Sequence, residues 1–223
     1  MDVVDRANRL RAHGEEAAGC TRCALQAGRT QVVFGAGNPA ARLMLVGEAP
    51  GFHEDKQGVP FVGQAGQLLE RLLAGIDLDR SDVYVANVLK CRPPGNRDPL
   101  ADEIAACEPH LFRQIETIAP RVVASLGNAA TRLLSGRDHG ITKVRGVPYE
   151  VAIGATRVTL LPLYHPAAAL YTPSMLDELE RDFACIPALL GVTLQEPAVA
   201  PPLAAPQPSP AAEPAVPVQL GLF

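Results

Sequence analysis

Four cysteines are spaced so that they could bind one inorganic group. Cys20 and Cys23 form a CxxC pair, Cys91 follows an apolar run, and Cys107 lies sixteen residues after Cys91. Four thiolates bind either Zn²⁺ or an iron–sulfur cluster, and this spacing is compatible with both. A redox-active pair is disfavoured because such CxxC motifs follow a strand in a βαβ unit. The pattern therefore predicts a structural site that ties the N-terminal segment to the loop around Cys91.

The remaining cysteine, Cys185, lies among apolar residues of a helical stretch, which predicts a buried core thiol. An odd number of cysteines disfavours a disulfide framework. The charged N-terminal residues resemble neither a secretory signal nor a transit peptide. No run approaches the ~18–20 continuous apolar residues of a membrane span. We therefore expect a cytoplasmic protein with no membrane segment.

A second set of residues suits the recognition of a small ligand. The run GEAPG at 47–51 ends an apolar segment in a glycine-flanked turn, where backbone amides can approach a ligand closely. Phe61 lies in a glycine-bounded apolar loop, so it is either a core residue or a stacking platform. Asn87 lies in an apolar run, where a buried amide needs partners. His165 follows another apolar run, and for each of these residues a purely structural role is also compatible with the pattern.

The elements that must position these residues alternate between strand and helix. The predicted strands are 42–47, 82–89, 121–126, 147–153 and 156–163. The predicted helices are 66–73, 98–118, 127–134 and 174–190, the last limited by Pro187. This alternation is typical of an α/β sandwich with a mainly parallel sheet. Because sites in such folds lie at the carboxyl ends of the strands, residues 47–51, residues 87–97 and His165 are expected at one edge.

Composition changes near the C-terminal end of the chain. Residues 196–217 consist almost entirely of Pro, Ala, Val and Gln and include eight prolines. Such a segment predicts a disordered linker at 195–218 after a folded domain at 1–194. The formal net charge is −4, so the chain is no bulk electrostatic binder of nucleic acid. Any contact with DNA would come from local basic loops, such as residues 90–97.

Taken together, four segments resemble the iron–sulfur (family 4) uracil-DNA glycosylases over about residues 20–190. These segments read GEAPG, EDKQGVPFVGQAGQLL, NVLKCRPPGNRDP and YHPAAAL. The resemblance implies a three-layer α/β/α sandwich with a central four-stranded sheet. It implies a repair enzyme that flips uracil out of DNA, hydrolyses its N-glycosidic bond and leaves an abasic site. It also implies a [4Fe–4S] cluster held by Cys20, Cys23, Cys91 and Cys107.

The same resemblance assigns roles within the substrate site. His165 would donate a hydrogen bond to uracil O2, Phe61 would stack on the base, and Asn87 would pair with N3–H and O4. Glu54 would form a wall against the methyl group of thymine. Glu48 is the nearest carboxylate for positioning water, because Ala49 replaces an aspartate found in the best-known branch of the superfamily. The implied catalytic residues are His165, Glu48 and Asn87, and the implied substrate-binding residues are Gly47, Glu48, Ala49, Glu54, Phe61, Asn87 and His165.

Contacts with the DNA backbone are expected from basic residues near this site. They are Arg92, Arg97, Lys143 and Arg145. Residues 167–171 are expected to form a loop that wedges into the gap left by the flipped base. One branch of the superfamily traps DNA covalently through a histidine in a basic loop, and residues 91–99 contain no histidine. We therefore expect an enzyme that turns over.

The C-terminal residues Gln219, Leu220, Leu222 and Phe223 resemble the short peptide with which bacterial repair proteins bind the DNA sliding clamp. An apolar end that folds back on the domain is the other interpretation. We expect a monomer whose partner is uracil-containing DNA. The alternatives are a glycosylase with broader substrates, such as hypoxanthine or ethenocytosine, and a non-catalytic DNA-binding module of the same fold.

Overall fold

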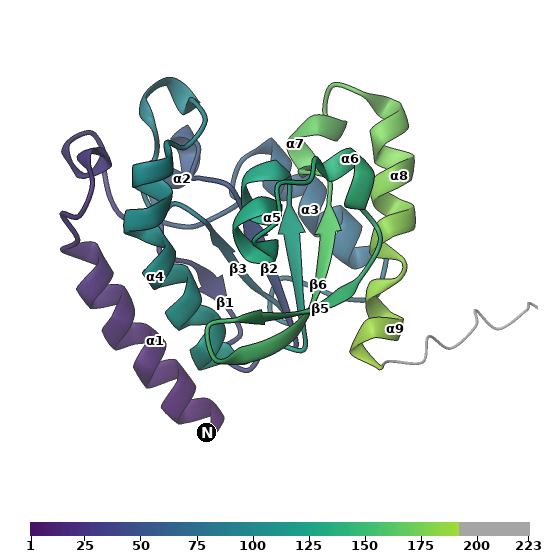
Figure 1. Ribbon diagram of the computed structural model, residues 1–223, viewed down its shortest axis with the longest axis horizontal. Helices are drawn as coiled ribbons and strands as arrows, with labels where there is room; N and C mark the ends of the chain where they lie inside the picture. Colours follow the sequence, from purple (N-terminus) through teal and green to yellow (C-terminus); the bar gives the residue numbers. More distant parts are fainter. Residues whose placement is uncertain (192–223) are drawn as a thin grey trace, which may run out of the picture. The chain divides into compact units, whose positions relative to one another are not determined.

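Six strands form a single mixed sheet in the order β1-β3-β2-β4-β6-β5 (Figure 1). The computed structural model describes residues 1–191, so the predicted linker at 195–218 and peptide at 219–223 lie outside the described residues. The strands are β1 (Ala36–Gly37), β2 (Leu43–Gly47), β3 (Tyr84–Asn87), β4 (Val122–Leu126), β5 (Tyr149–Ile153) and β6 (Thr156–Leu163). The four central strands are parallel, as the sequence predicts, and the antiparallel edge strands β1 and β5 extend the sheet to six.

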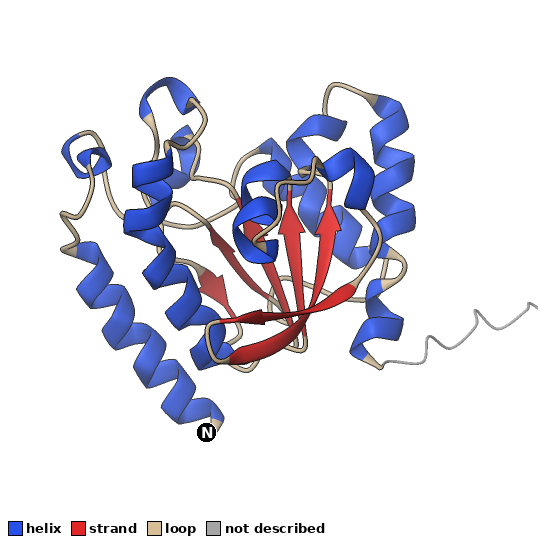
Figure 2. Ribbon diagram, viewed as in Figure 1, coloured by secondary structure: helices blue, strands red, loops and turns tan. Residues whose placement is uncertain are grey.

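Helices cover both faces of this sheet (Figure 2). They are α1 (Val3–Ala18), α2 (Phe52–Gln57), α3 (Gln64–Ala74), α4 (Ala101–Ile118), α5 (Asn128–Ser135), α6 (Ile141–Val144), α7 (Pro166–Ala169), α8 (Pro173–Phe183) and α9 (Ile186–Leu190). The expected α/β sandwich is therefore confirmed. Within residues 1–191, none of these helices combines the length and apolar character needed to cross a bilayer.

The alternation of side chains along the central strands separates the core into two layers. Leu43 and Leu45 of β2 face the layer that contains α3, α8 and α9. Met44 and Val46 face the opposite layer, which contains α1, α4 and α5. Every residue of β2 and of β4 is buried. Strands covered by helices on both faces must be apolar throughout, which explains why they read as continuous hydrophobic runs.

The C-terminal helical region differs from the single helix expected at 174–190. It forms two helices, α8 and α9, that are separated at Ala184 and Cys185. Pro187 lies in the first turn of α9, where its missing N–H is tolerated. Cys185 is half-buried, and its thiol donates a hydrogen bond to the carbonyl of Asp182 at 2.8 Å. Cys185 packs against the core as expected, but it is only partly buried.

The N-terminal helix α1 was absent from the sequence-based prediction. Most of its side chains are exposed, and its buried residues are Leu10, His13 and Ala17. This narrow stripe packs against α4 (Figure 1). A stripe of one residue per turn gives a weak periodic pattern, which explains why the sequence did not indicate the helix.

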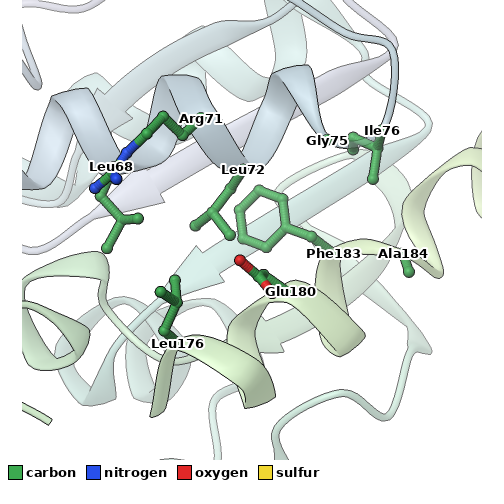
Figure 3. Close-up of a pocket in the computed structure, with 9 residues that line it drawn as sticks. All are labelled: Leu68, Arg71, Leu72, Gly75, Ile76, Leu176, Glu180, Phe183 and Ala184. Carbon is green, nitrogen blue, oxygen red and sulfur yellow. The ribbon is translucent and has the colours of Figure 1, made fainter. Parts of the chain in front are cut away.

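An apolar groove of ≈ 340 Å³ runs between α3 and α8 (Figure 3). Leu68 and Leu72 of α3 face Leu176 and Phe183 of α8 across it. None of the residues that the sequence assigns to chemistry lines this groove.

We expect Phe183→Ala to lower the free energy of unfolding by about 3–5 kcal/mol, because the ring is 1% exposed and its removal leaves a cavity. Urea denaturation followed by circular dichroism measures the change. Val4→Ala is the control, since Val4 is 69% exposed and its truncation should change stability by less than about 0.5 kcal/mol. Equal midpoints for Phe183→Ala and the unsubstituted protein would contradict this account.

Candidate active site

The carboxyl ends of the central strands form a crevice at the point where the chain reverses direction across the sheet. The chain passes from β2 through α3 to β3, then through α4 to β4 on the other side of β2. Because α3 and α4 lie on opposite faces of the sheet, the loops that precede them separate at this edge. A cavity of ≈ 260 Å³ lies there. It is lined by Glu48, Ala49, Pro50, Gly51, Glu54, Phe61, Ala65, Asn87, Pro93, Asn96, Arg97, His165 and Ala167.

Six of the seven substrate-binding residues expected from the sequence line this cavity, and the seventh, Gly47, lies directly beside them. Gly47 pairs in register with Asn87 at the ends of β2 and β3. A Cβ atom at Gly47 would lie 2.4 Å from Asn87 Oδ1 and 2.7 Å from Phe61 Cζ. Neither distance is possible in a real structure, so only glycine lets Phe61 and Asn87 meet at the end of β2.

Phe61 is held in an unusual backbone conformation. Its φ is +56°, in the left-handed region that costs a residue with a side chain on the order of 1 kcal/mol. The next two amides, of Val62 and Gly63, both donate hydrogen bonds to Glu54 Oε1 at 3.0 Å. Gly66 fits closely against the same turn, since a Cβ atom there would lie 1.9 Å from the carbonyl oxygen of Phe61. Glu54 therefore fixes the loop that carries Phe61.

His165 faces Phe61 across the cavity, with ring centroids 5.6 Å apart and an angle of 27° between the planes. His165 follows β6 and caps the first turn of α7, where its Nδ1 accepts a hydrogen bond from the Ala167 amide at 3.1 Å. Since Nδ1 is an acceptor, the proton of the neutral ring lies on Nε2. Burial lowers the pKa of His165 to about 4, against an opposing effect of the Glu54 carboxylate. At neutral pH the ring is therefore a neutral donor.

Asn87 presents an unpaired acceptor in this cavity. The side chain is 2% exposed, and its Oδ1 has no hydrogen-bond partner among residues 1–191. A buried acceptor without a partner costs roughly 1–3 kcal/mol, so such atoms usually have a ligand or a water molecule to bind. Oδ1 is thus an unpartnered acceptor on a residue that lines the cavity.

Glu48 supplies a carboxyl group to the same cavity, whereas Ala49 contributes only a methyl group. Burial raises the pKa of the Glu48 carboxyl, and the nearby charge of Asp98 raises it further. A carboxylate with a raised pKa is a better proton acceptor than one in water. Its geometry thus allows Glu48 to bind and orient a water molecule.

The four cysteines assigned to one inorganic site line a second cavity. Cys20 and Cys23 follow α1, Cys91 follows β3, and Cys107 lies in α4. Within residues 1–191, no three His, Cys, Asp or Glu side chains converge as tightly as a single ion would need. The four thiols nevertheless line one shared space, as the ligands of a single inorganic group must.

Positive groups surround these sulfur atoms. Arg29 Nη1 donates to Cys91 Sγ at 3.5 Å, and the Lys90 amide donates to Cys107 Sγ at 3.2 Å. Burial raises the pKa of the Cys91 and Cys107 thiols, while Arg29 and Lys90 respectively act in the opposite direction. Donors and cations of this kind stabilise thiolate ligands. The residues present therefore fit an anionic iron–sulfur centre.

Lys90 is a buried residue whose role the sequence did not indicate. It is 2% exposed, and its Nζ donates to the Asn87 carbonyl at 2.9 Å and to Gln114 Oε1 at 2.6 Å. Burial lowers the pKa of the ammonium to about 8, so it remains charged at neutral pH. Lys90 begins the basic loop at 90–97, but its own side chain points inward and is not exposed to a phosphate. The sequence around Lys90 and Cys91 does not indicate whether the lysine side chain points inward or toward solvent.

Two of the four expected DNA-backbone contacts are already paired with carboxylates. Arg97 lies at the cavity edge and binds Glu103 through two hydrogen bonds of 2.9 and 2.6 Å. Arg145 binds Asp182 and Glu178, each at 2.8 Å. Both guanidinium groups therefore have structural partners, and a phosphate would have to compete with these carboxylates.

The other two expected contacts carry free charges. Neither Arg92 nor Lys143 lies within ion-pair distance of a carboxylate among the described residues. Arg92 donates to Asn96 Oδ1 at 2.7 Å and lies 5.1 Å from the centroid of the exposed Phe52 ring. The expected wedge loop at 167–171 begins in the short helix α7 and ends at Tyr171, which is 83% exposed.

Comparisons with known proteins agree with this geometry. A model of the uracil DNA glycosylase superfamily matches residues 34–185. The chain is 47% identical to the type-4 uracil-DNA glycosylase of Sulfurisphaera tokodaii over 174 residues, which cover 76% of this chain and 79% of that protein. It is 46% identical to the Archaeoglobus fulgidus enzyme over 176 residues, covering 77% and 88%. Its identity to the Thermotoga maritima enzyme is 47% over 163 residues, covering 73% and 82%.

We expect the His165 ring to stay neutral, with its proton on Nε2, from pH 8 to about pH 5, because its pKa is about 4. Heteronuclear NMR of ¹⁵N-histidine-labelled protein measures both properties. Since the pKa in the folded state lies below the ordinary 6.5, the unfolded chain binds the proton first. His165 therefore makes the free energy of unfolding decrease as the pH falls from 6.5 to 4. In His165→Asn this part of the pH dependence should be absent. A ring that titrates near pH 6.5 would contradict the assignment.

Proposed function

We propose, from the premise that this chain belongs to the uracil DNA glycosylase superfamily, that it removes uracil from DNA by hydrolysing the N-glycosidic bond. The product is an abasic site, the substrate for later steps of base excision repair. One observation carries the proposal. Phe61, Asn87 and His165 bring an aromatic face, an unpaired amide oxygen and a neutral imidazole donor into one cavity.

The depth of this cavity requires that the base leave the helix. Phe61 and Asn87 are 7% and 2% exposed, so a base stacked in a duplex could not contact them. Extrusion of the nucleotide costs a few kcal/mol, which contacts in the cavity must offset. Stacking on the Phe61 ring contributes about 1–3 kcal/mol of that amount.

Asn87 distinguishes uracil from cytosine. Uracil carries an N3–H donor, which the unpaired Oδ1 of Asn87 can accept. Cytosine has an acceptor at N3 and would leave Oδ1 without a partner. A site built on such hydrogen bonds rejects the wrong base by large factors, because a buried polar group remains unpaired.

His165 stabilises the departing base. Cleavage of the bond between C1′ and N1 leaves negative charge on the uracil ring, much of it on O2. The Nε2–H of a neutral imidazole donates to that oxygen without transferring its proton. Glu48 then positions the water that attacks C1′, and its raised pKa makes it an effective acceptor for the proton of that water.

The four cysteines hold a [4Fe–4S] cluster in this proposal, and the shared cavity that they line supports it. When bound, the cluster supplies four iron–thiolate bonds that cross-link distant segments. Cys20 and Cys23 are thereby tied to Cys91, which follows the strand that ends in Asn87. The cluster is thus a structural support for the uracil site.

Arg92 and Lys143 bind the phosphates of the DNA strand, because each carries a free charge in the described part of the chain. Arg97 and Arg145 contribute by holding the cavity edge and α8 in place. The turn from Ala167 to Tyr171 enters the gap left by the extruded nucleotide, since Ala167 lines the cavity and Tyr171 is exposed.

Incubation of the iron-loaded protein with a uracil-containing oligonucleotide tests the function directly. Mass spectrometry should detect free uracil, and alkali should cleave the strand at the abasic site. Strands with hypoxanthine, ethenocytosine or cytosine test for broader specificity. Residues 91–99 contain no histidine, so the protein should release its product without a denaturant-resistant adduct. Absence of abasic sites would overturn the proposal in favour of a non-catalytic DNA-binding module.

His165→Ala should lower the single-turnover rate of uracil release about a hundredfold to a thousandfold, because it removes the donor to O2. DNA binding should change little, since the phosphate contacts are intact. His139→Ala is the matched control, because His139 is exposed and lies outside the cavity. Full activity of His165→Ala would show that another group stabilises the leaving base.

Cys91→Ala should lose iron and stability together, because one of four cluster ligands is removed. Iron analysis, visible absorption and thermal unfolding of anaerobically purified protein measure these losses. The control Cys185→Ala should keep its iron, since Cys185 does not line the shared cavity. About four irons per chain are expected, whereas one tightly bound zinc would contradict the cluster.

The C-terminal residues Gln219, Leu220, Leu222 and Phe223 bind the DNA sliding clamp in this proposal, supported by their resemblance to clamp-binding peptides. Deletion of residues 219–223 should abolish clamp binding measured by surface plasmon resonance. Cleavage of short oligonucleotides should be unchanged, because tethering acts only through effective concentration near the clamp. Equal clamp affinity of the truncated protein would refute this role.

A further inference from the structure

Lys90 connects the cysteine cavity with the base cavity. Its backbone amide donates to Cys107 Sγ at 3.2 Å, and the residue itself lines the cysteine cavity. Its side chain turns back along the chain, and Nζ donates to the carbonyl of Asn87 at 2.9 Å. Asn87 lines the base cavity. One residue therefore contacts both a cysteine of the first cavity and the backbone of a residue that lines the second.

The burial of this ammonium group needs a reason beyond stability. Among residues 1–191, no carboxylate lies within ion-pair distance of Lys90 Nζ. Its second acceptor is Gln114 Oε1 at 2.6 Å, and Gln114 in turn donates to Tyr84 Oη at 3.2 Å. Burying an ammonium without an ionic partner is costly, and apolar residues of similar size often give a more stable protein.

The reason for burying the Lys90 ammonium is that the Asn87 side chain needs a fixed orientation. Its Oδ1 has no partner in the described part of the chain, so no hydrogen bond to that oxygen holds the side chain toward the substrate. Oδ1 lies in the space beside Gly47 that a Cβ atom would fill, so the position of the Asn87 backbone decides where the amide lies. The carbonyl of that backbone is the group that Lys90 Nζ binds. A shift of about 1 Å in a group that contacts the substrate can lower the rate a hundredfold.

We propose that Lys90 is a positioning residue. It holds the Asn87 side chain in the orientation that pairs with uracil, and it couples this orientation to the cysteine site. The inference rests on the proposed function, because it assumes that Asn87 reads the base. The link to the cysteine site is geometric, because the same residue donates its backbone amide to Cys107 Sγ and its Nζ to the Asn87 carbonyl.

The test measures base discrimination by affinity instead of by turnover. The probes are single strands carrying either 2′-fluoro-2′-deoxyuridine, which resists hydrolysis, or its cytidine counterpart. Fluorescence anisotropy gives the ratio of the two dissociation constants. Visible absorption confirms that each variant contains the cluster. The unsubstituted protein is first shown to release uracil and to prefer the uridine strand; failure at this step overturns the proposed function.

Lys90→Met keeps an unbranched side chain, one atom shorter, and removes the charge together with the hydrogen bonds of Nζ. The preference for uridine should fall about tenfold, which corresponds to roughly one strong hydrogen bond. Gln114→Met leaves Lys90 with one acceptor and should lower the preference by a smaller amount. Tyr84→Phe is the matched control, because it removes a hydroxyl from the same network without touching Lys90 or Asn87, and its preference should be unchanged.

Each outcome decides the proposal. An unchanged preference in Lys90→Met that has retained its cluster overturns it. If Lys90→Met does not fold, an unchanged preference in Gln114→Met overturns it. Equal losses in Tyr84→Phe and Gln114→Met also overturn it, because they would show a general effect of the buried network. A loss that follows the order Lys90→Met, Gln114→Met, Tyr84→Phe supports it.

Discussion

The absence of a side chain at Gly47 is the constraint on which the site depends. A single methyl group there would occupy the space of Asn87 Oδ1 and of the Phe61 ring. These two groups reach the end of β2 from different elements, one from the adjacent strand and one from a loop stabilised by Glu54. Parallel pairing of β2 with β3 sets their spacing, and the missing Cβ allows their contact. The remaining parts of the site are arranged around that contact.

The site is built from polar groups that the crevice buries in part or completely. Burial removes the charge of His165 and raises the proton affinity of Glu48. The same burial leaves Asn87 Oδ1 without a partner among residues 1–191. In such surroundings a hydrogen bond is electrostatically stronger than in water, so a few well-placed donors and acceptors can discriminate between similar bases. The fold thus brings Glu48, Asn87 and His165 together at the ends of β2, β3 and β6.

The fold and much of the site could be predicted because both depend on local patterns. Apolar runs such as 43–47 mark strands buried on both faces, and polar residues that follow such runs must meet at one edge of the sheet. The sequence could not predict whether an individual charged side chain is buried, paired or free, because this depends on partners distant in sequence. Lys90 binds Gln114, and Arg145 binds Asp182, across separations that no local pattern encodes. Helix α1 was missed for a related reason, since only Leu10, His13 and Ala17 are buried.

That narrow stripe on α1 has a consequence for the N-terminal part of the molecule. A helix attached through one buried residue per turn contributes little packing of its own. Its C-terminal end leads directly to Cys20 and Cys23, which share a cavity with Cys91 and Cys107. Any group that joined these four thiols would therefore restrain α1 as well as the loop after β3.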